Sequence, residues 1–129
     1  MRKVKRKKLK SLKALKDEAW NLQSKHIRSS AANFQGMCAC FCCGVLKDWR
    51  EMDLSHYIHN RLDFYLNNLR VCCVRCNRFL HGNLGVYGEK LIKEIGLKEV
   101  EKMRLYSYKK GNNYSRTELT EIIARYKLT

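Results

Sequence analysis

Residues 40–44 read CFCCG and residues 73–77 read CVRCN, so the chain carries two Cys-x-x-Cys pairs. Two intervening residues let a tight turn direct both sulfurs toward one tetrahedral ion at about 2.3 Å. Two such turns close a site of four thiolates. The spacing therefore predicts one structural zinc ion, Zn²⁺, held by Cys40, Cys43, Cys73 and Cys76.

Three further cysteines, Cys38, Cys42 and Cys72, complicate this assignment. A pair such as Cys38/Cys42 or Cys72/Cys76 would shift the register of the site, but it breaks the two-residue spacing. Seven cysteines in a short chain favour metal binding over disulfides in a reducing compartment, because thiols stay free there. The alternative is that the thiols are free, either buried or at the surface.

Charge is the strongest compositional feature. The 129 residues fit one compact domain with terminal extensions. Lys and Arg number 27 against 12 Asp and Glu, which gives a formal net charge of +15. Such an excess favours a polyanionic partner through phosphate neutralisation and counterion release, so we expect the protein to bind nucleic acid.

A basic chain can also coat an anionic membrane, but that function needs a lipid anchor or a long helix with large apolar residues on one face. No stretch approaches the ~18 consecutive apolar residues of a membrane span. Residues 1–10 lack the apolar segment of a signal peptide. We therefore expect a cytoplasmic protein with no membrane partner.

Residues 1–33 are predicted to form a basic arm followed by an amphipathic helix. Apolar residues recur at helical spacing at Leu9, Leu12, Leu15, Ala19 and Leu22, which predicts a helix to about Ser24. The cations of the arm are expected to contact DNA phosphates; they are Arg2, Lys3, Lys5, Arg6, Lys7 and Lys8. The alternative is a solubilising charge run.

Residues 34–96 are predicted to form the cysteine-bearing core, with short hairpins before a helix that ends at Gly96. Residues 97–129 are predicted to form two more helices, the second capped by Ser115-x-x-Glu118. We expect these helices to pack on the metal core. Their possible phosphate contacts are Lys109, Lys110 and Arg116.

Between the knuckles, residues 53–83 read DLSHYIHNRLDFYLNNLRVCCVRCNRFLHGN. A neutral imidazole can take a proton from water at cellular pH, so His56 is a candidate general base for attack on phosphorus. Asn77 and His81 lie four residues apart, so on a helix they would share a face and reach one ion. The alternatives are a structural or zinc-binding His56, a helix-capping Asn77 and a phosphate-contacting His81.

The segment resembles the HNH, or ββα-metal, nuclease core, which includes the endonuclease VII type of junction nuclease. The resemblance rests on a strand with His56, a loop Asn68 before the second knuckle, and a helix with Asn77 after Cys76. It implies an α+β fold: a small zinc-stapled ββα-metal (HNH/His-Me finger) core flanked by N-terminal and C-terminal helices. It also implies that His56 is the base, that Asn68 ties down the loop and orients His56, and that Asn77 helps hold one Mg²⁺ or Mn²⁺.

A closer resemblance, to the phage NinG (Rap) recombination endonucleases, spans most of the chain from Ala19 to Lys127. The motifs that carry it are Cys40-x-x-Cys43-Gly44, Asp53-x-x-His56-Tyr57, Asn68, Cys73-x-x-Cys76-Asn77, and Gly82-Asn83 with Tyr87, Leu91, Ile92, Ile95 and Gly96. This resemblance implies a structure-selective endonuclease in the host cytoplasm. Its substrates would be branched recombination intermediates such as Holliday junctions and D-loops.

One position departs from the HNH pattern. Many HNH cores place Asp or His directly before the base, where this chain has Ser55. Asp53 lies three residues ahead of His56, on the other side of a regular strand, and a bulge could redirect it. We predict that Asp53 joins Asn77 and His81 as ligands of the catalytic ion.

Three further expectations complete the sequence-based hypothesis. Arg75 and Arg78, beside the second knuckle, are expected to bind DNA. The rings of Tyr57, Phe64 and Tyr65 could stack on exposed bases at a branch or simply pack in the core. Paired cuts across a junction favour a homodimer. The alternative function is a noncatalytic zinc-ribbon DNA-binding protein, which needs the cysteines and the charge but not His56.

Overall fold

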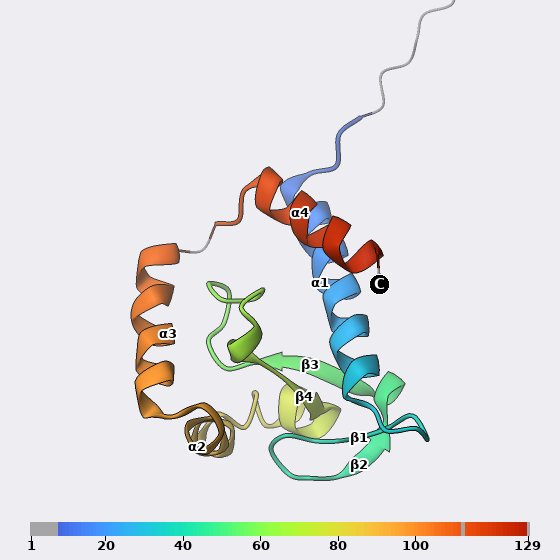
Figure 1. Cartoon of the computed structure of the whole chain (residues 1–129), viewed down its shortest axis with the longest axis vertical. Helices are drawn as coiled ribbons and strands as arrows, with labels where there is room; N and C mark the ends of the chain where they lie inside the picture. Colours follow the sequence, from blue (N-terminus) through green and yellow to red (C-terminus); the bar gives the residue numbers. More distant parts are fainter. Residues whose placement is uncertain (1–7, 112, 129) are drawn as a thin grey trace, which may run out of the picture.

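The computed structural model describes residues 8–111 and 113–128, and its fold is α+β, as predicted. Helices surround two small antiparallel strand pairs (Figure 1). The elements are α1 (Leu12–Ala31), β1 (Met37–Ala39), β2 (Leu46–Asp48), η1 (Trp49–Glu51), β3 (Met52–His56), η2 (Leu66–Asn68), β4 (Leu69–Cys73), η3 (Arg75–Phe79), α2 (Leu84–Ile95), α3 (Leu97–Lys110) and α4 (Arg116–Lys127). Within the described residues, no helix is long and apolar enough to span a bilayer.

Each strand pair presents one half of the cysteine cluster. β1 and β2 pair from Met37↔Asp48 to Ala39↔Leu46, and the first Cys-x-x-Cys turn lies at the tip of this hairpin. β3 and β4 pair from Met52↔Cys73 to His56↔Leu69, so the second turn begins at the end of β4. The loop between β3 and β4 starts directly after His56. Cys73 and the candidate base His56 therefore lie at opposite ends of the same β3–β4 ladder.

The helical turn after β4 is short. η3 is a single π-type turn that ends at Phe79, and a left-handed Asn83 (φ 49°) then starts α2. Gly82 and Asn83 separate η3 from α2, because Gly82 has φ 89° and Asn83 also lies in the left-handed region. The chain thus passes from β3 to β4 and then, through the second Cys-x-x-Cys turn, into the helical turn η3.

Local signals set the ends of the longer helices. Ser11 caps α1 by accepting a hydrogen bond from the Ala14 amide, and α1 runs to Ala31, beyond the predicted end near Ser24. α2 ends before Gly96, whose φ of 91° suits a residue without a side chain. Ser115 and Glu118 form both hydrogen bonds of the predicted capping box.

Two separate apolar clusters hold the molecule together. The larger cluster includes Tyr87 and Leu91 from α2, Val100 and Met103 from α3, and every cysteine except Cys43. The smaller cluster joins α1 to α4 through Leu15, Ala19, Leu119 and Ile123. Figure 1 shows α4 lying along α1, away from the strands. The prediction that both C-terminal helices pack on the metal core is therefore right for α3 and wrong for α4, whose apolar face meets α1.

Candidate functional site

The four predicted zinc cysteines form a compact cluster. The sulfurs of Cys40, Cys43, Cys73 and Cys76 all lie within 4.8 Å of one another, and the Cys43 and Cys73 sulfurs are 3.7 Å apart. A tetrahedral ion with bonds of about 2.3 Å needs sulfurs roughly 3.8 Å apart, so this spacing suits zinc. Among the described residues, this is the cluster of His, Cys, Asp and Glu side chains placed to hold a metal ion.

Backbone amides support the thiolates from the two turns. The Cys43 amide donates to the Cys40 sulfur at 3.5 Å, and the Cys76 amide donates to the Cys73 sulfur at 3.4 Å. The side chain of Asn83 donates to the Cys76 sulfur at 3.7 Å. These hydrogen bonds reach the sulfurs of Cys40, Cys73 and Cys76 and favour the charged form that binds a metal.

The thiols differ in acidity because they are packed together. Burial raises the pKa of Cys40, but hydrogen bonds with Cys43, Cys73 and Cys42 outweigh it and lower the pKa to about 6. Burial raises the pKa of Cys76 to about 12. A divalent cation would compensate the repulsion between thiolates, so metal binding here releases protons.

The remaining cysteines lie outside this cluster, which confirms the predicted register. The sulfurs of Cys42 and Cys72 are 3.9 Å apart in the core, and Cys38 is buried in β1. Burial raises the pKa of all three thiols. They are therefore neutral core side chains beside the metal ligands.

A cleft of about 510 Å³ lies between α1, β3 and η3. It brings together three residues predicted from the sequence, His56, Asp53 and Asn77, with three arginines. Its lining residues are Trp20, Asn21, Ser24, Arg28, Arg50, Met52, Asp53, Leu54, His56, Asn77 and Arg78. In this cleft the candidate base therefore lies with the oxygen-bearing side chains of Asp53 and Asn77 and with the arginines.

Asp53 is anchored to η3 without a bulge in its strand. β3 pairs residue by residue with β4, so the predicted bulge is wrong, yet Asp53 still faces the cleft. Its carboxylate accepts from the Asn77 amide at 3.0 Å and from two guanidinium nitrogens of Arg78, each at 2.9 Å. The short turn after Cys76 accounts for this pairing, because it returns Asn77 and Arg78 beside the strand.

His56 sits at the end of β3 with its ring between other rings. Trp20 meets it edge-on with centroids 5.5 Å apart, and His59 lies 4.1 Å away in the same manner. Its Nδ1 is buried and has no hydrogen-bond partner among the described residues. Burial and then the charge of His59 lower the pKa of His56 below 6.5, against the opposing effect of Asp63. The imidazole is therefore neutral at neutral pH.

Asn68 ties down the loop that follows His56. Its side chain is fully buried; it accepts from the Ile58 amide at 2.8 Å and donates to the carbonyls of Ile58 at 2.8 Å and Leu62 at 3.0 Å. The Asn68 carbonyl accepts from the Tyr57 amide. These bonds fix the backbone next to His56. Within the described structure, no hydrogen bond joins the Asn68 side chain to the His56 ring.

The helical basis for His81 as a ligand is wrong. η3 ends at Phe79, and His81 has φ 50° in the left-handed turn that follows. His81 is exposed and lies outside the cleft lining, so the face that it was predicted to share with Asn77 does not exist. Its role as a ligand remains a prediction without that support.

The predicted DNA-binding residues fall into three groups. Arg78 borders the cleft, while Arg75 is exposed at the start of η3 outside it. Lys8 is exposed ahead of α1. The other residues of the basic arm lie outside the described residues; they are Arg2, Lys3, Lys5, Arg6 and Lys7.

Sequence reasoning missed four side chains of this region. Trp20 and Arg28 reach the cleft from α1, and Arg28 donates to the carbonyls of Trp49 and Met52. Lys16, also on α1, lies 3.1 Å from Asp63, whose other carboxylate oxygen is 3.9 Å from His56 Nε2. No local motif marks these residues. For Lys16, Trp20 and Arg28, their places between the apolar positions of α1 were the available signal.

The fold and the cysteine cluster define a small α+β protein with four cysteines positioned for one zinc-like ion. A family model described as Bacteriophage Lambda NinG protein matches residues 1–129. The chain therefore belongs to the NinG family, as its motifs predicted. No curated protein and no solved structure matches the chain.

Proposed function

We propose that the protein is a metal-dependent DNA endonuclease that cuts branched recombination intermediates, with His56 as the general base. The observation that carries this proposal is the shared cleft: a neutral imidazole, the Asp53–Asn77 pair and the arginines all line it. The order of strand β3, strand β4 and turn η3 supports an HNH-type core. Hydrolysis needs a base, a charge stabiliser and a phosphate site in one place.

His56 suits proton transfer at cellular pH. A general base must be unprotonated before it acts, and the lowered pKa of His56 keeps the ring neutral at pH 7. Trp20 and His59 restrict the ring from two directions. The Asn68 hydrogen bonds fix the adjoining loop. These contacts therefore position the imidazole to take a proton from an attacking water.

Asp53 and Asn77 fit a divalent cation because they offer carboxylate and amide oxygens, the donors preferred by Mg²⁺ and Mn²⁺. When bound, such an ion supplies Lewis-acid stabilisation of charge on the phosphate. In the structure, Arg78 forms an ion pair with Asp53. Because its side chain is exposed, Arg78 can leave Asp53 for a substrate phosphate once the carboxylate holds an ion.

The cations around the cleft suit a DNA backbone. Arg50 and Arg78 are exposed at its edge, and Arg28 is held from α1 by hydrogen bonds to backbone carbonyls. Planar guanidinium groups bind phosphate through paired hydrogen bonds. With a net charge of +15, the chain has the electrostatics of a nucleic-acid-binding protein.

The test is cleavage of end-labelled Holliday junction, flap, D-loop, single-stranded and linear duplex DNA in Mg²⁺ or Mn²⁺. We expect wild type to cut branched DNA preferentially. His56→Ala should bind DNA but lose about 10²- to 10⁴-fold in rate, as expected for loss of a general base. Asn77→Ala should bind and fail to cut.

His26→Ala is the matched control, because His26 lies on α1 outside the cleft. His26→Ala should cut like wild type. All three variants should retain zinc and a cooperative thermal unfolding transition. Binding without cleavage by wild type in every metal would contradict the proposal. The protein would then be a zinc-ribbon DNA-binding module.

A further inference from the structure

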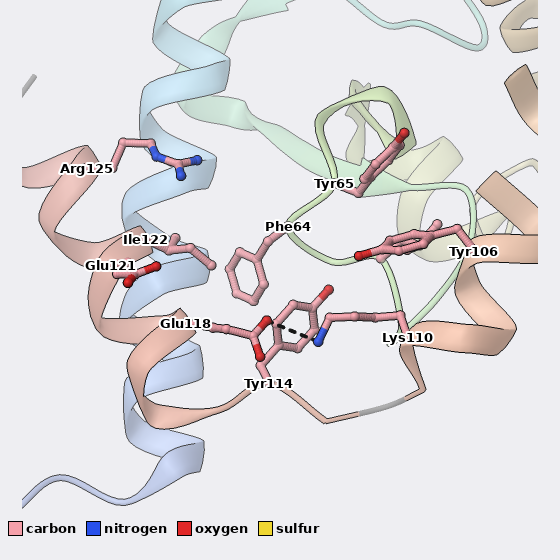
Figure 2. A pocket seen from close by; sticks show the side chains of 10 residues that line it. Phe64, Tyr65, Tyr106, Lys110, Tyr114, Glu118, Glu121, Ile122 and Arg125 are labelled. Atoms are coloured by element: carbon pink, nitrogen blue, oxygen red, sulfur yellow. Dashed lines mark ion pairs between the residues drawn. The ribbon is translucent and has the colours of Figure 1, made fainter. Parts of the chain in front are cut away.

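A second pocket, separate from the His56 cleft, lies where the β3–β4 loop meets the end of α3 and one face of α4 (Figure 2). It has a volume of about 240 Å³. Its lining residues are Leu62, Phe64, Tyr65, Tyr106, Lys110, Tyr114, Glu118, Glu121, Ile122 and Arg125. This volume is below the ~300–1,000 Å³ typical of sites for drug-sized ligands, which indicates a small flat guest.

Four aromatic rings line this pocket. Phe64 and Tyr114 meet edge-on with centroids 5.0 Å apart, and Figure 2 shows both at the centre of the pocket. Tyr65 and Tyr106 lie at its other end, 5.9 Å apart and tilted by 40°. These last two rings are 37% and 44% exposed, so they are available to a ligand without disrupting the core.

The charges in the pocket are mixed, which argues against an isolated phosphate as the occupant. Lys110 lies 3.1 Å from Glu118 and 4.2 Å from the Tyr114 ring centroid. Arg125 and Glu121 enter from the same helix, α4, as Figure 2 shows. A nucleobase carries donors and acceptors on its edge and a π-face for stacking, so it matches this combination better than an anion does.

Aromatic contacts also connect this pocket to the His56 cleft. Phe64 meets Trp20 with centroids 6.3 Å apart, and Trp20 meets His56 at 5.5 Å. Trp20 lines the cleft and Phe64 lines the pocket. The aromatic pocket and the His56 cleft are therefore neighbours, joined by the contact between Phe64 and Trp20.

We propose that this aromatic pocket binds an unpaired nucleobase of the DNA, an inference that rests on the proposed function for the identity of the substrate. A base inside intact duplex DNA is stacked on both faces and paired along one edge. An unpaired base at a branch or in a single strand presents its faces at little cost. The pocket thereby gives the protein a physical preference for branched over linear DNA.

The test measures DNA binding without added Mg²⁺ or Mn²⁺, so that it is independent of cleavage. The probes are a branched DNA with 2-aminopurine at an unpaired position and a linear duplex of equal length. We expect binding to quench 2-aminopurine fluorescence. Tyr106→Ala and Tyr65→Ala should each weaken branched-DNA binding about tenfold, the loss for one stacking ring, and leave duplex binding unchanged.

Tyr106→Phe should keep the quenching, because stacking needs the ring and not the hydroxyl. Tyr108→Ala is the matched control: it removes an exposed ring from the same helix but outside the pocket lining. Wild-type affinity and quenching in both Tyr106→Ala and Tyr65→Ala would overturn the inference, even in a protein that cuts DNA. Selective loss in a protein that cuts nothing would support the inference while the endonuclease proposal failed.

Discussion

At the scale of single residues, the environment of His56 is the feature with the clearest chemical consequence. Burial lowers its pKa, the charge of His59 lowers it further, and Lys16 acts in the same direction. Asp63 opposes them from 3.9 Å. The acidity of the candidate base is therefore set by groups from α1 and from the loop after β3.

We predict that Asp63→Asn shifts the acid limb of the cleavage pH profile to lower pH. The carboxylate of Asp63 stabilises the imidazolium, so its removal lowers the pKa of His56 and keeps the ring neutral in more acid solution. Asparagine keeps the oxygen that accepts from the Asn60 amide. The measurement is the cleavage rate against pH.

Asp17→Asn is the control. Asp17, Asp63 and His56 line one small cavity, and Asp17 does not contribute to the pKa shift of His56. An unchanged acid limb in Asp63→Asn would contradict this account.

In wild type the lowered pKa of His56 also makes the free energy of unfolding fall as the pH drops below 6.5, because the unfolded chain binds a proton that the folded chain resists.

At the scale of elements, α2 is pressed against the residue that follows the candidate base. A Cβ at Gly88 would lie 2.7 Å from the Tyr57 hydroxyl and 3.1 Å from its Cζ. Tyr57 cannot easily retreat, because its ring stacks on Tyr87 with centroids 5.6 Å apart. The structure thus packs the half-buried Tyr57 against the core, which favours packing over the predicted possibility of base stacking.

We predict opposite effects from the two glycines of α2. Gly88→Ala should lower the free energy of unfolding by about 1–3 kcal/mol, because the new methyl group displaces the Tyr57 ring. Gly85→Ala should raise it by about 0.5–1 kcal/mol, since nothing lies within 4 Å and alanine is the better helix former. Urea unfolding checks both. Equal effects of the two substitutions would show that Tyr57 yields without cost.

Several element boundaries could be predicted because their causes are local. The Cys-x-x-Cys turns, Gly96 and the Ser115–Glu118 capping box each depend on residues a few positions apart. The cleft could not be predicted in full, because Trp20 reaches His56 only after α1 packs beside β3. His81 was misplaced because the tight turn after Phe79 breaks the helical register.

At the scale of the whole molecule, the metal cluster is expected to decide whether the larger core folds. Cys40, Cys73 and Cys76 are buried in that core while Cys43 is exposed, and the two Cys-x-x-Cys pairs lie at the ends of two short strand pairs. Structural zinc contributes about 10–16 kcal/mol in small zinc domains, comparable to the whole stability of ~5–15 kcal/mol of a typical domain.

We predict that Cys76→Ser abolishes zinc binding and the cooperative thermal transition, and that a strong chelator does the same to wild type. Cys42→Ala should keep one zinc per chain and lose only about 1 kcal/mol, because Cys42 is buried outside the cluster. Metal analysis and thermal melting check both variants. A folded, zinc-free Cys76→Ser would show that the cluster is dispensable.

The packing of α1 against α4 has a consequence for synthesis. Leu15 and Ala19 of α1 find their apolar partners Leu119 and Ile123 a hundred or more positions later. Such non-local contacts form late, since a ribosome releases the N-terminal part first. While α4 is still in the exit tunnel, one apolar stripe of α1 stays uncovered. The helix that brings Trp20 and Arg28 to the cleft is thus fully packed only after α4 has left the tunnel.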